Sequence, residues 1–216
     1  MTRALAITVS NRASAGIYAD KSGPVLAELL RSAGCETDGP VVIPDGAPVQ
    51  AALREALAAG YDLIVTTGGT GLTPGDLTPE MTRLLIDREI PGIAEAIRAA
   101  GVSAGVPAAM LSRGVVGLAG TTLIVNLPGS TGGVRDGMSV LQSVLHHAID
   151  QARGGDHPRP TVLSATGGLD GLSPTGGLDG ADEPEGAMIV RWHMLAAGRS
   201  RSPSRACSGR RSRCGH

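Results

Sequence analysis

The chain of 216 residues has almost no aromatic side chains: phenylalanine is absent, tryptophan occurs once and tyrosine twice. Its core must therefore be built from alanine, valine, leucine and isoleucine. The three cysteines have no tight spacing, which argues against a secreted disulfide framework and favours the cytoplasm. No apolar run reaches the roughly 18 residues of a membrane helix, and the N-terminus lacks a signal-peptide pattern. We therefore expect neither export nor membrane contact.

Lysine is also scarce, since Lys21 is the only one, and the formal net charge is −1. Residues 191–216 carry seven arginines and no acidic residue, interleaved with serine, glycine and alanine. This composition buries too little apolar surface to order itself, and without interleaved aromatics it does not indicate nucleic-acid binding. We predict one domain over residues 1–156, followed by a low-complexity, disordered tail over residues 157–216.

Within residues 1–156, short apolar runs alternate with segments of helical periodicity. The continuous run Leu63, Ile64, Val65 is typical of a parallel strand that is covered on both faces. Such alternation predicts an α/β fold. The expected strands are 4–10, 40–43, 62–67, 115–118 and 121–127, and the expected helices are 23–33, 49–59, 79–87, 93–100 and 133–153.

A glycine-rich segment, residues 66–80, follows the buried strand and precedes a helix. In open α/β sheets, ligands bind beyond the carboxyl ends of the strands. Glycines allow backbone N–H groups to approach a phosphate, and Asp76 would bring a carboxylate that magnesium could bridge to it. The residues expected to contact phosphate are Gly68, Gly69, Thr70 and Gly71. A tight connection without a ligand is the alternative interpretation, and the segment is neither a P-loop nor a dinucleotide fingerprint.

The sequence Thr-Gly-Gly-Thr-Gly, followed by Asp-Leu-Thr-Pro-Glu at 76–80, resembles the signature of the molybdopterin-binding MogA/MoaB family. Other similar segments occur in the family's order: Ser10-Asn11 with Asp20 and Ser22-Gly-Pro, Ile43-Pro-Asp45, Met110-Leu-Ser-Arg113 and Asn126-Leu-Pro-Gly129. The resemblance covers residues 2–153. It implies a three-layer α/β/α sandwich around a mostly parallel sheet, and a homotrimer.

The resemblance also implies an activity. In such enzymes the terminal phosphate of molybdopterin attacks the α-phosphate of Mg-ATP, which yields adenylylated molybdopterin and pyrophosphate. Asp45 and Asp76 match the acidic pair that is required for catalysis, and they would hold the magnesium ion. Implied phosphate or nucleotide contacts, besides the glycine segment, are Ser10, Asp20 and Ser22. Implied pterin contacts are Ser112, Arg113, Asn126, Pro128 and Gly129.

Two departures from the family pattern keep a second function open. Asn11 stands where many relatives carry aspartate, and Gly75 stands where catalytic relatives often carry arginine. The alternative is a MoaB-like protein that binds pterin, or acts as a scaffold, without efficient adenylylation. A third hypothesis is an interaction protein that presents pterin to a molybdenum insertase. A relative of the CinA domain is a fourth, although the second catalytic domain of that family has no counterpart in the sequence.

Overall fold

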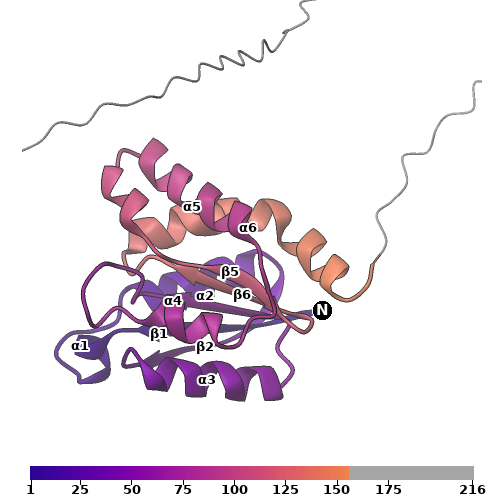
Figure 1. Cartoon of the computed structure of the whole chain (residues 1–216), viewed down its shortest axis with the longest axis horizontal. Coiled ribbons are helices and arrows are strands. Elements are labelled where there is room, and N and C mark those ends of the chain that lie inside the picture. Colours follow the sequence, from indigo (N-terminus) through magenta and orange to yellow (C-terminus); the bar gives the residue numbers. More distant parts are fainter. Residues whose placement is uncertain (156–216) are drawn as a thin grey trace, which may run out of the picture. The chain divides into compact units, whose positions relative to one another are not determined.

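A computed structural model describes residues 1–155 (Figure 1). Four parallel strands form most of one sheet: β2 (Cys35–Ile43), β1 (Thr2–Val9), β3 (Leu63–Thr67) and β6 (Thr122–Leu127). Two antiparallel strands, β5 (Val116–Ala119) and β4 (Arg88–Glu89), complete it beside β6. The predicted tail over residues 157–216 lies outside the described residues, so the predicted domain boundary stays a prediction.

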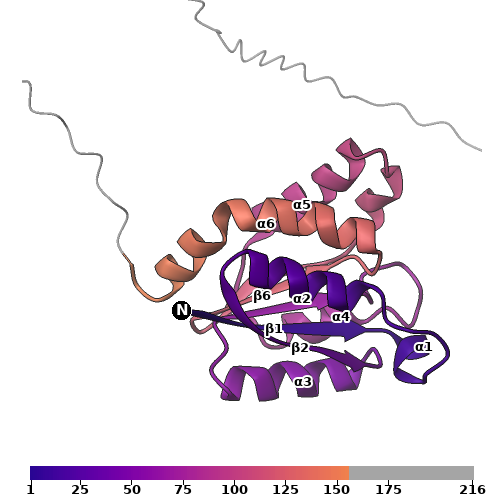
Figure 2. The ribbon, with the colours of Figure 1, turned by 180° about the vertical axis from the view of Figure 1, so that it is seen from behind.

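Helices cover both faces of this sheet, as Figures 1 and 2 show from opposite sides. On one face lie α2 (Ser22–Ser32), α5 (Pro91–Ser103) and α6 (Thr131–Ala152). On the other lie α3 (Ala47–Ala58) and α4 (Thr78–Arg83). The remaining elements are α1 (Asn11–Ser14) and a short 3-10 helix, η1 (Pro107–Leu111). The three-layer α/β/α sandwich around a mostly parallel sheet is thereby confirmed.

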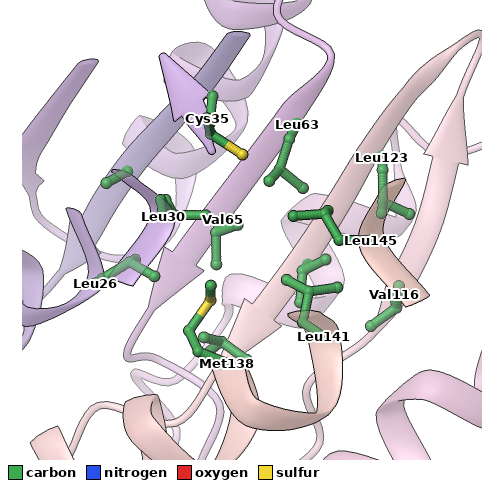
Figure 3. Close-up of a cluster of buried hydrophobic side chains, with 14 of the residues drawn as sticks. Leu26, Leu30, Cys35, Leu63, Val65, Val116, Leu123, Met138, Leu141 and Leu145 are labelled. Carbon is green, nitrogen blue, oxygen red and sulfur yellow. The ribbon is translucent and has the colours of Figure 1, made fainter. Parts of the chain in front are cut away.

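The two halves of the core follow from the alternation of side chains along each strand. Leu63 and Val65 of β3 pack with α2 and α6, whereas Ile64 between them packs with α3. Figure 3 shows the first of these clusters, in which Leu26 of α2 and Leu141 of α6 meet the sheet. The described core is aliphatic, as the absence of phenylalanine requires.

Several element boundaries differ from the prediction. Strand β2 begins at Cys35 rather than near residue 40. The first half of this edge strand is polar and exposed, so the sequence shows no apolar pattern there. Helix α4 ends at Arg83, four residues before the predicted end. The pattern also missed α1, β4 and η1, which are too short to show periodicity. The predicted pairing of 115–118 with 121–127 is confirmed by the antiparallel contact of β5 with β6.

Over residues 1–155, we find no helix with the length and apolarity to cross a membrane.

The carboxyl ends of β1, β3 and β6 lie side by side, and the backbone there is in unusually close contact. A Cβ atom on Gly68, just after β3, would lie 2.2 Å from the carbonyl oxygen of Val9 at the end of β1. The amide of Gly68 donates to the carbonyl of Leu127 at 3.1 Å, which joins β3 to β6. This end of the sheet also includes the switch point between β1 and β3. The connection after β1 runs to β2 on one side and the connection after β3 runs toward β4 on the other, and α/β folds place ligands at such a point.

At the amino ends of the strands, Asp62, which precedes β3, joins the start of β1 to the residue after α6. Its carboxylate accepts a hydrogen bond from the amide of Arg3 at 2.8 Å and pairs with Arg153, after α6, at 2.6 Å. Burial acts to raise the pKa of Asp62, but the Arg3 amide and the Arg153 guanidinium outweigh it, so the pKa lies below its ordinary value. Asp62 therefore stabilises the fold in its charged form.

We expect Asp62→Asn to lower the free energy of unfolding near pH 7 by about 1 kcal/mol. Because the pKa is lowered on folding, this stabilisation is present above the pKa of the unfolded chain and is lost as the pH falls through the folded pKa. Urea unfolding at several pH values measures it, with exposed Glu95→Gln as the control. A stability difference that does not shrink in acid would contradict this role.

Gly68→Ala should be more destabilising than Gly60→Ala, although both residues have positive φ angles, +104° and +74°. A Cβ at Gly60 meets nothing within 4 Å, so that substitution costs only the backbone strain, about 1–2 kcal/mol. At Gly68 the Val9 carbonyl must move as well, which adds about 1–3 kcal/mol. Urea unfolding of both variants isolates the steric part, and equal losses would show that the contact is not constraining.

Candidate functional site

The glycine loop, residues 68–71, lies against an acidic side chain from another connection. Gly69 has φ +64°, and a Cβ there would lie 2.1 Å from Oδ2 of Asp45 and 2.2 Å from Oγ1 of Thr78. No larger residue fits without displacing the carboxylate. The loop therefore brings the backbone that follows β3 directly to the residue that follows β2.

Only one of the two carboxylate oxygens of Asp45 is hydrogen-bonded. Its Oδ1 accepts hydrogen bonds from the amide of Gly46 at 2.6 Å and from the hydroxyl of Thr78 at 3.2 Å. Its own amide donates to Oδ1 of Asn11 at 2.9 Å. Its Oδ2 is buried and has no hydrogen-bond partner among the described residues. Such an orphaned carboxylate oxygen is costly unless a ligand completes it.

The electrostatic surroundings of Asp45 also favour the binding of a cation. Burial is the main cause that raises the pKa of Asp45, and the negative charge of Asp76 adds to it. The hydrogen bonds from Gly46 and Thr78 and the nearby Leu77 amide oppose this rise in pKa without cancelling it. A cation beside the two carboxylates would remove the repulsion and favour the charged form of Asp45.

Asp76 completes the acidic pair that the sequence predicted. Its Oδ2 accepts from the amide of Thr73 at 2.9 Å and from the Thr73 hydroxyl at 2.6 Å. Asp45 and Asp76 line one small cavity of about 350 Å³ together with Ser10, Asn11 and other residues. Residues 1–155 contain no cluster of three histidine, cysteine or acidic side chains that would form a complete metal site. The pair suits magnesium, which takes few protein carboxylates and completes its shell with phosphate and water.

Two larger cavities flank the glycine loop. The first cavity, about 470 Å³, lies between the loop, α5, η1 and the start of α6. The second cavity, about 650 Å³, lies between the loop, α1 and the start of α2. Gly68, Gly69, Gly129 and Ser130 line both cavities. Two ligands bound on either side would therefore meet across backbone that carries little side-chain bulk.

The structure brings most of the expected site residues to these cavities. Those that line the first cavity are Gly68, Gly69, Thr70, Gly71, Asp76, Ser112, Pro128 and Gly129. Ser10, Asp20 and Ser22 line the second cavity. Asp20, however, is already engaged: its carboxylate accepts from the Thr8 hydroxyl at 2.7 Å and from the amides of Ser22 and Gly23 at 3.0 Å. It fixes the start of α2, and its own phosphate contact stays a prediction.

Arg113 and Asn126, two of the implied pterin contacts, do not line the first cavity. The Arg113 guanidinium donates to the carbonyl of Gly71 at 2.7 Å, to the carbonyl of Asp76 and to Glu80. The Asn126 amide is buried, donates to the hydroxyls of Thr66 and Thr82 at 3.0 Å, and accepts from the Val115 amide at 3.3 Å. These side chains hold the loop and the sheet beneath it, and their implied contact with pterin stays a prediction.

Sequence reasoning missed two charged residues of the first cavity, Arg98 on α5 and Asp136 on α6. Neither belongs to a glycine-rich segment or follows a strand. On their helices they occupy half-exposed positions like many other charged residues, so no local signal distinguishes them.

Comparison with known proteins agrees with this architecture. Residues 5–147 match the family model described as a probable molybdopterin binding domain. The structure of the Mog protein from Mycobacterium ulcerans is 52% identical, with a TM-score of 0.67, and the match covers 70% of this chain and 99% of that one.

Two curated relatives extend the comparison. A molybdopterin adenylyltransferase of Pyrococcus furiosus is 35% identical over 68% of this chain and 89% of its own length. A molybdenum cofactor biosynthesis bifunctional protein of Synechococcus elongatus is 39% identical over 71% of this chain and 48% of its own length. The chain thus spans about half the length of the bifunctional relatives that it matches. With a matching family model, a matching fold and these relatives, the chain belongs to the MogA/MoaB family of molybdenum cofactor biosynthesis proteins.

Proposed function

We propose that the protein is a molybdopterin adenylyltransferase, which transfers AMP from Mg-ATP to the terminal phosphate of molybdopterin and releases pyrophosphate. The observation that carries this proposal is the pair of cavities that share the glycine loop as a common wall. A transfer between two substrates needs such a meeting point, because the reacting phosphates must approach each other within a few ångströms. The similarity to a relative named molybdopterin adenylyltransferase supports the reaction class.

In this proposal the first cavity takes molybdopterin. Its far wall is largely apolar, with Ile97 and Leu111, whereas its near wall is the glycine loop. The hydroxyl of Ser112 donates to Oγ1 of Thr70 at 3.2 Å, which leaves the Thr70 hydroxyl proton available for a phosphate oxygen. The pterin ring lies toward the apolar wall, and its phosphate reaches the loop.

The second cavity then takes ATP. Arg12 and Lys21 line it and supply positive charge for the triphosphate. The guanidinium of Arg12 lies 5.1 Å from the ring centre of Tyr18, and the hydroxyl of Tyr18 is 3.0 Å from that of Ser10. These contacts hold the side chains of this wall together. The attacking phosphate and the α-phosphate meet where Gly68, Gly69 and Gly129 leave room.

The acidic pair lies beside this meeting point. Asp45, with its orphaned oxygen, and Asp76 would hold magnesium, which when bound would neutralise phosphate charge. Thr73 orients one oxygen of Asp76, and Asn11 orients the backbone of Asp45. These side chains form no covalent bond to the substrates, so catalysis rests on positioning and electrostatic stabilisation.

A pterin-binding protein without efficient adenylylation is the second candidate, and two residues favour it. Asn11 brings no negative charge to the acidic pair. Gly75 brings no cation. A side chain would fit at this position, because a Cβ there would come no closer than 3.9 Å to Nδ2 of Asn11. Arg12 lines the same small cavity and supplies a cation from another direction, which favours the enzyme.

We further propose that the protein works as a homotrimer in the cytoplasm and passes its product to a molybdenum insertase. Met110 is 64% exposed beside Val106 and Leu111, which line the first cavity, and this apolar surface supports self-association. Cys35 is free and buried, which suits a reducing compartment. The relatives named bifunctional, about twice the matched length, support a functional link to a second activity.

Asp76→Asn should lower the rate of adenylylated product formation by about 100-fold or more, because a preorganised charge at the reacting phosphates is lost. Molybdopterin binding should remain. The assay follows adenylylated pterin and pyrophosphate from molybdopterin and Mg-ATP. Asp87→Asn is the matched control, since Asp87 accepts from the Gly120 amide at 2.6 Å, outside all three site cavities. Undiminished turnover in Asp76→Asn would remove its role, and tight pterin binding without product in the unaltered protein would favour the second candidate.

The Asp45 carboxyl should titrate above its ordinary pKa, and Mg²⁺ should lower that pKa because a cation stabilises the charged form. The site loses negative charge as the pH falls through this pKa, so magnesium affinity and transfer rate should fall together. Carbon-13 NMR of labelled aspartate measures the titration, with Asp45→Asn for assignment. Asp76→Asn should lower the pKa even without Mg²⁺. A titration that is insensitive to Mg²⁺ would exclude a cation at this pair.

A further inference from the structure

One side chain bonds residues 71–76, the segment that carries Asp76, to a distant part of the fold. The segment is half-buried at its two ends and exposed between them. Within residues 1–155, its hydrogen bonds either join Thr73 to Asp76 or come from Arg113. The first group stays inside the segment, so among the described residues Arg113 alone holds it from outside.

Arg113 holds both ends of this segment at once. Its Nε donates to the carbonyl of Gly71 at 2.7 Å, and its Nη2 donates to the carbonyl of Asp76. Its own backbone amide donates to the carbonyl of Thr70 at 2.8 Å, which fixes Arg113 beside the glycine loop. A guanidinium can bond two carbonyls in this way because its donors form a rigid, planar fork, whereas an ammonium is a single compact group.

Glu80 determines where the charge of Arg113 is neutralised. Its Oε1 accepts from Nη1 of Arg113, and its Oε2 is buried without a hydrogen-bond partner among residues 1–155. The guanidinium therefore meets Asp76 through the backbone carbonyl, while its ion pair is with Glu80. The carboxylate of Asp76 accepts from Thr73 instead, so it keeps its negative charge for a ligand.

We propose that Arg113 and Glu80 are positioning residues for the adenylyl transfer: together they hold Asp76 in place and leave its carboxylate unpaired. Arg113 fixes the backbone at Asp76. Glu80 keeps the guanidinium off the Asp76 carboxylate, which would otherwise be its strongest nearby partner, because a charged acceptor binds a guanidinium more tightly than a carbonyl does. This inference rests on the proposed function, which gives Asp76 its role at the reacting phosphates.

The first experiment measures amide hydrogen exchange of the full chain by NMR, without any ligand. In Arg113→Gln, the amides of Thr73 and Asp76 should exchange about tenfold faster or more, because the charge-assisted bonds that close the segment are lost. The amide of Gly120, which is hydrogen-bonded in a different loop, should keep its rate. Arg83→Gln removes a half-exposed ion pair of the same kind and is the matched control, in which all three amides should keep their rates.

The second experiment measures kcat and KM with molybdopterin and Mg-ATP. Arg113→Gln should lower kcat by about tenfold or more and leave the KM for molybdopterin within about twofold, because the lost bonds act on Asp76 rather than on the ligand. Arg113→Lys should recover little of this rate, since an ammonium cannot bond both carbonyls. Glu80→Gln should also lower kcat, because the guanidinium becomes free to pair with Asp76.

A double variant tests whether the two residues act as one unit. Once the guanidinium is absent, Glu80 has nothing to position, so Arg113→Gln combined with Glu80→Gln should be no slower than Arg113→Gln alone. Circular dichroism verifies that each variant is folded. Additive losses in the double variant would contradict the proposal.

Unchanged exchange at Thr73 and Asp76, a rise in KM that accounts for the whole loss, or full recovery in Arg113→Lys would likewise overturn the positioning role. The proposed function fails separately. If the unaltered protein forms no adenylylated product, that function is lost, and the exchange experiment still decides whether Arg113 holds Asp76 in place. Transfer at the full rate in folded Arg113→Gln overturns only this inference.

Discussion

The contact of bare backbone at the ends of three parallel strands is the constraint on which the site depends. Gly68 lies against the Val9 carbonyl, Gly69 lies against Asp45, and a Cβ on Gly129 would come within 3.2 Å of the Gly68 Cα. Without side chains at these positions, the connections after β1, β3 and β6 can meet. The two large cavities share one wall for the same reason, and the acidic pair can lie beside it.

Behind this wall a set of polar side chains supports the loop without lining the first cavity. Arg113 joins the carbonyls of Gly71 and Asp76 to Glu80, so it fixes both ends of the segment that carries Asp76. Asn126 does the same for the strands beneath, through Thr66 and Thr82. A sequence motif marks ligand contacts and their supports alike, because both must keep their spacing. Only the bonding pattern separates them, as it does for Asp20.

Much of the fold could be predicted, because apolar periodicity and turn chemistry are local. The parallel strands, the aliphatic core and the position of the glycine loop all followed from such patterns. The start of β2 did not, since an exposed edge strand carries polar residues. Arg98 and Asp136 could not be found either. What places them in one cavity is the packing of α5 and η1 over the loop, which depends on contacts between distant parts of the chain.

Asp45 shows how folding and ligand binding are linked at this site. A buried carboxylate oxygen without a partner, beside a second acid, opposes folding. Ionisable groups kept at such a cost are concentrated at functional sites. A cation and the phosphates it accompanies would complete the missing interactions, and a ligand that binds only the folded chain stabilises it. The orphaned oxygen of Asp45 therefore lowers the stability of the folded chain, and a cation bound beside it would offset that loss.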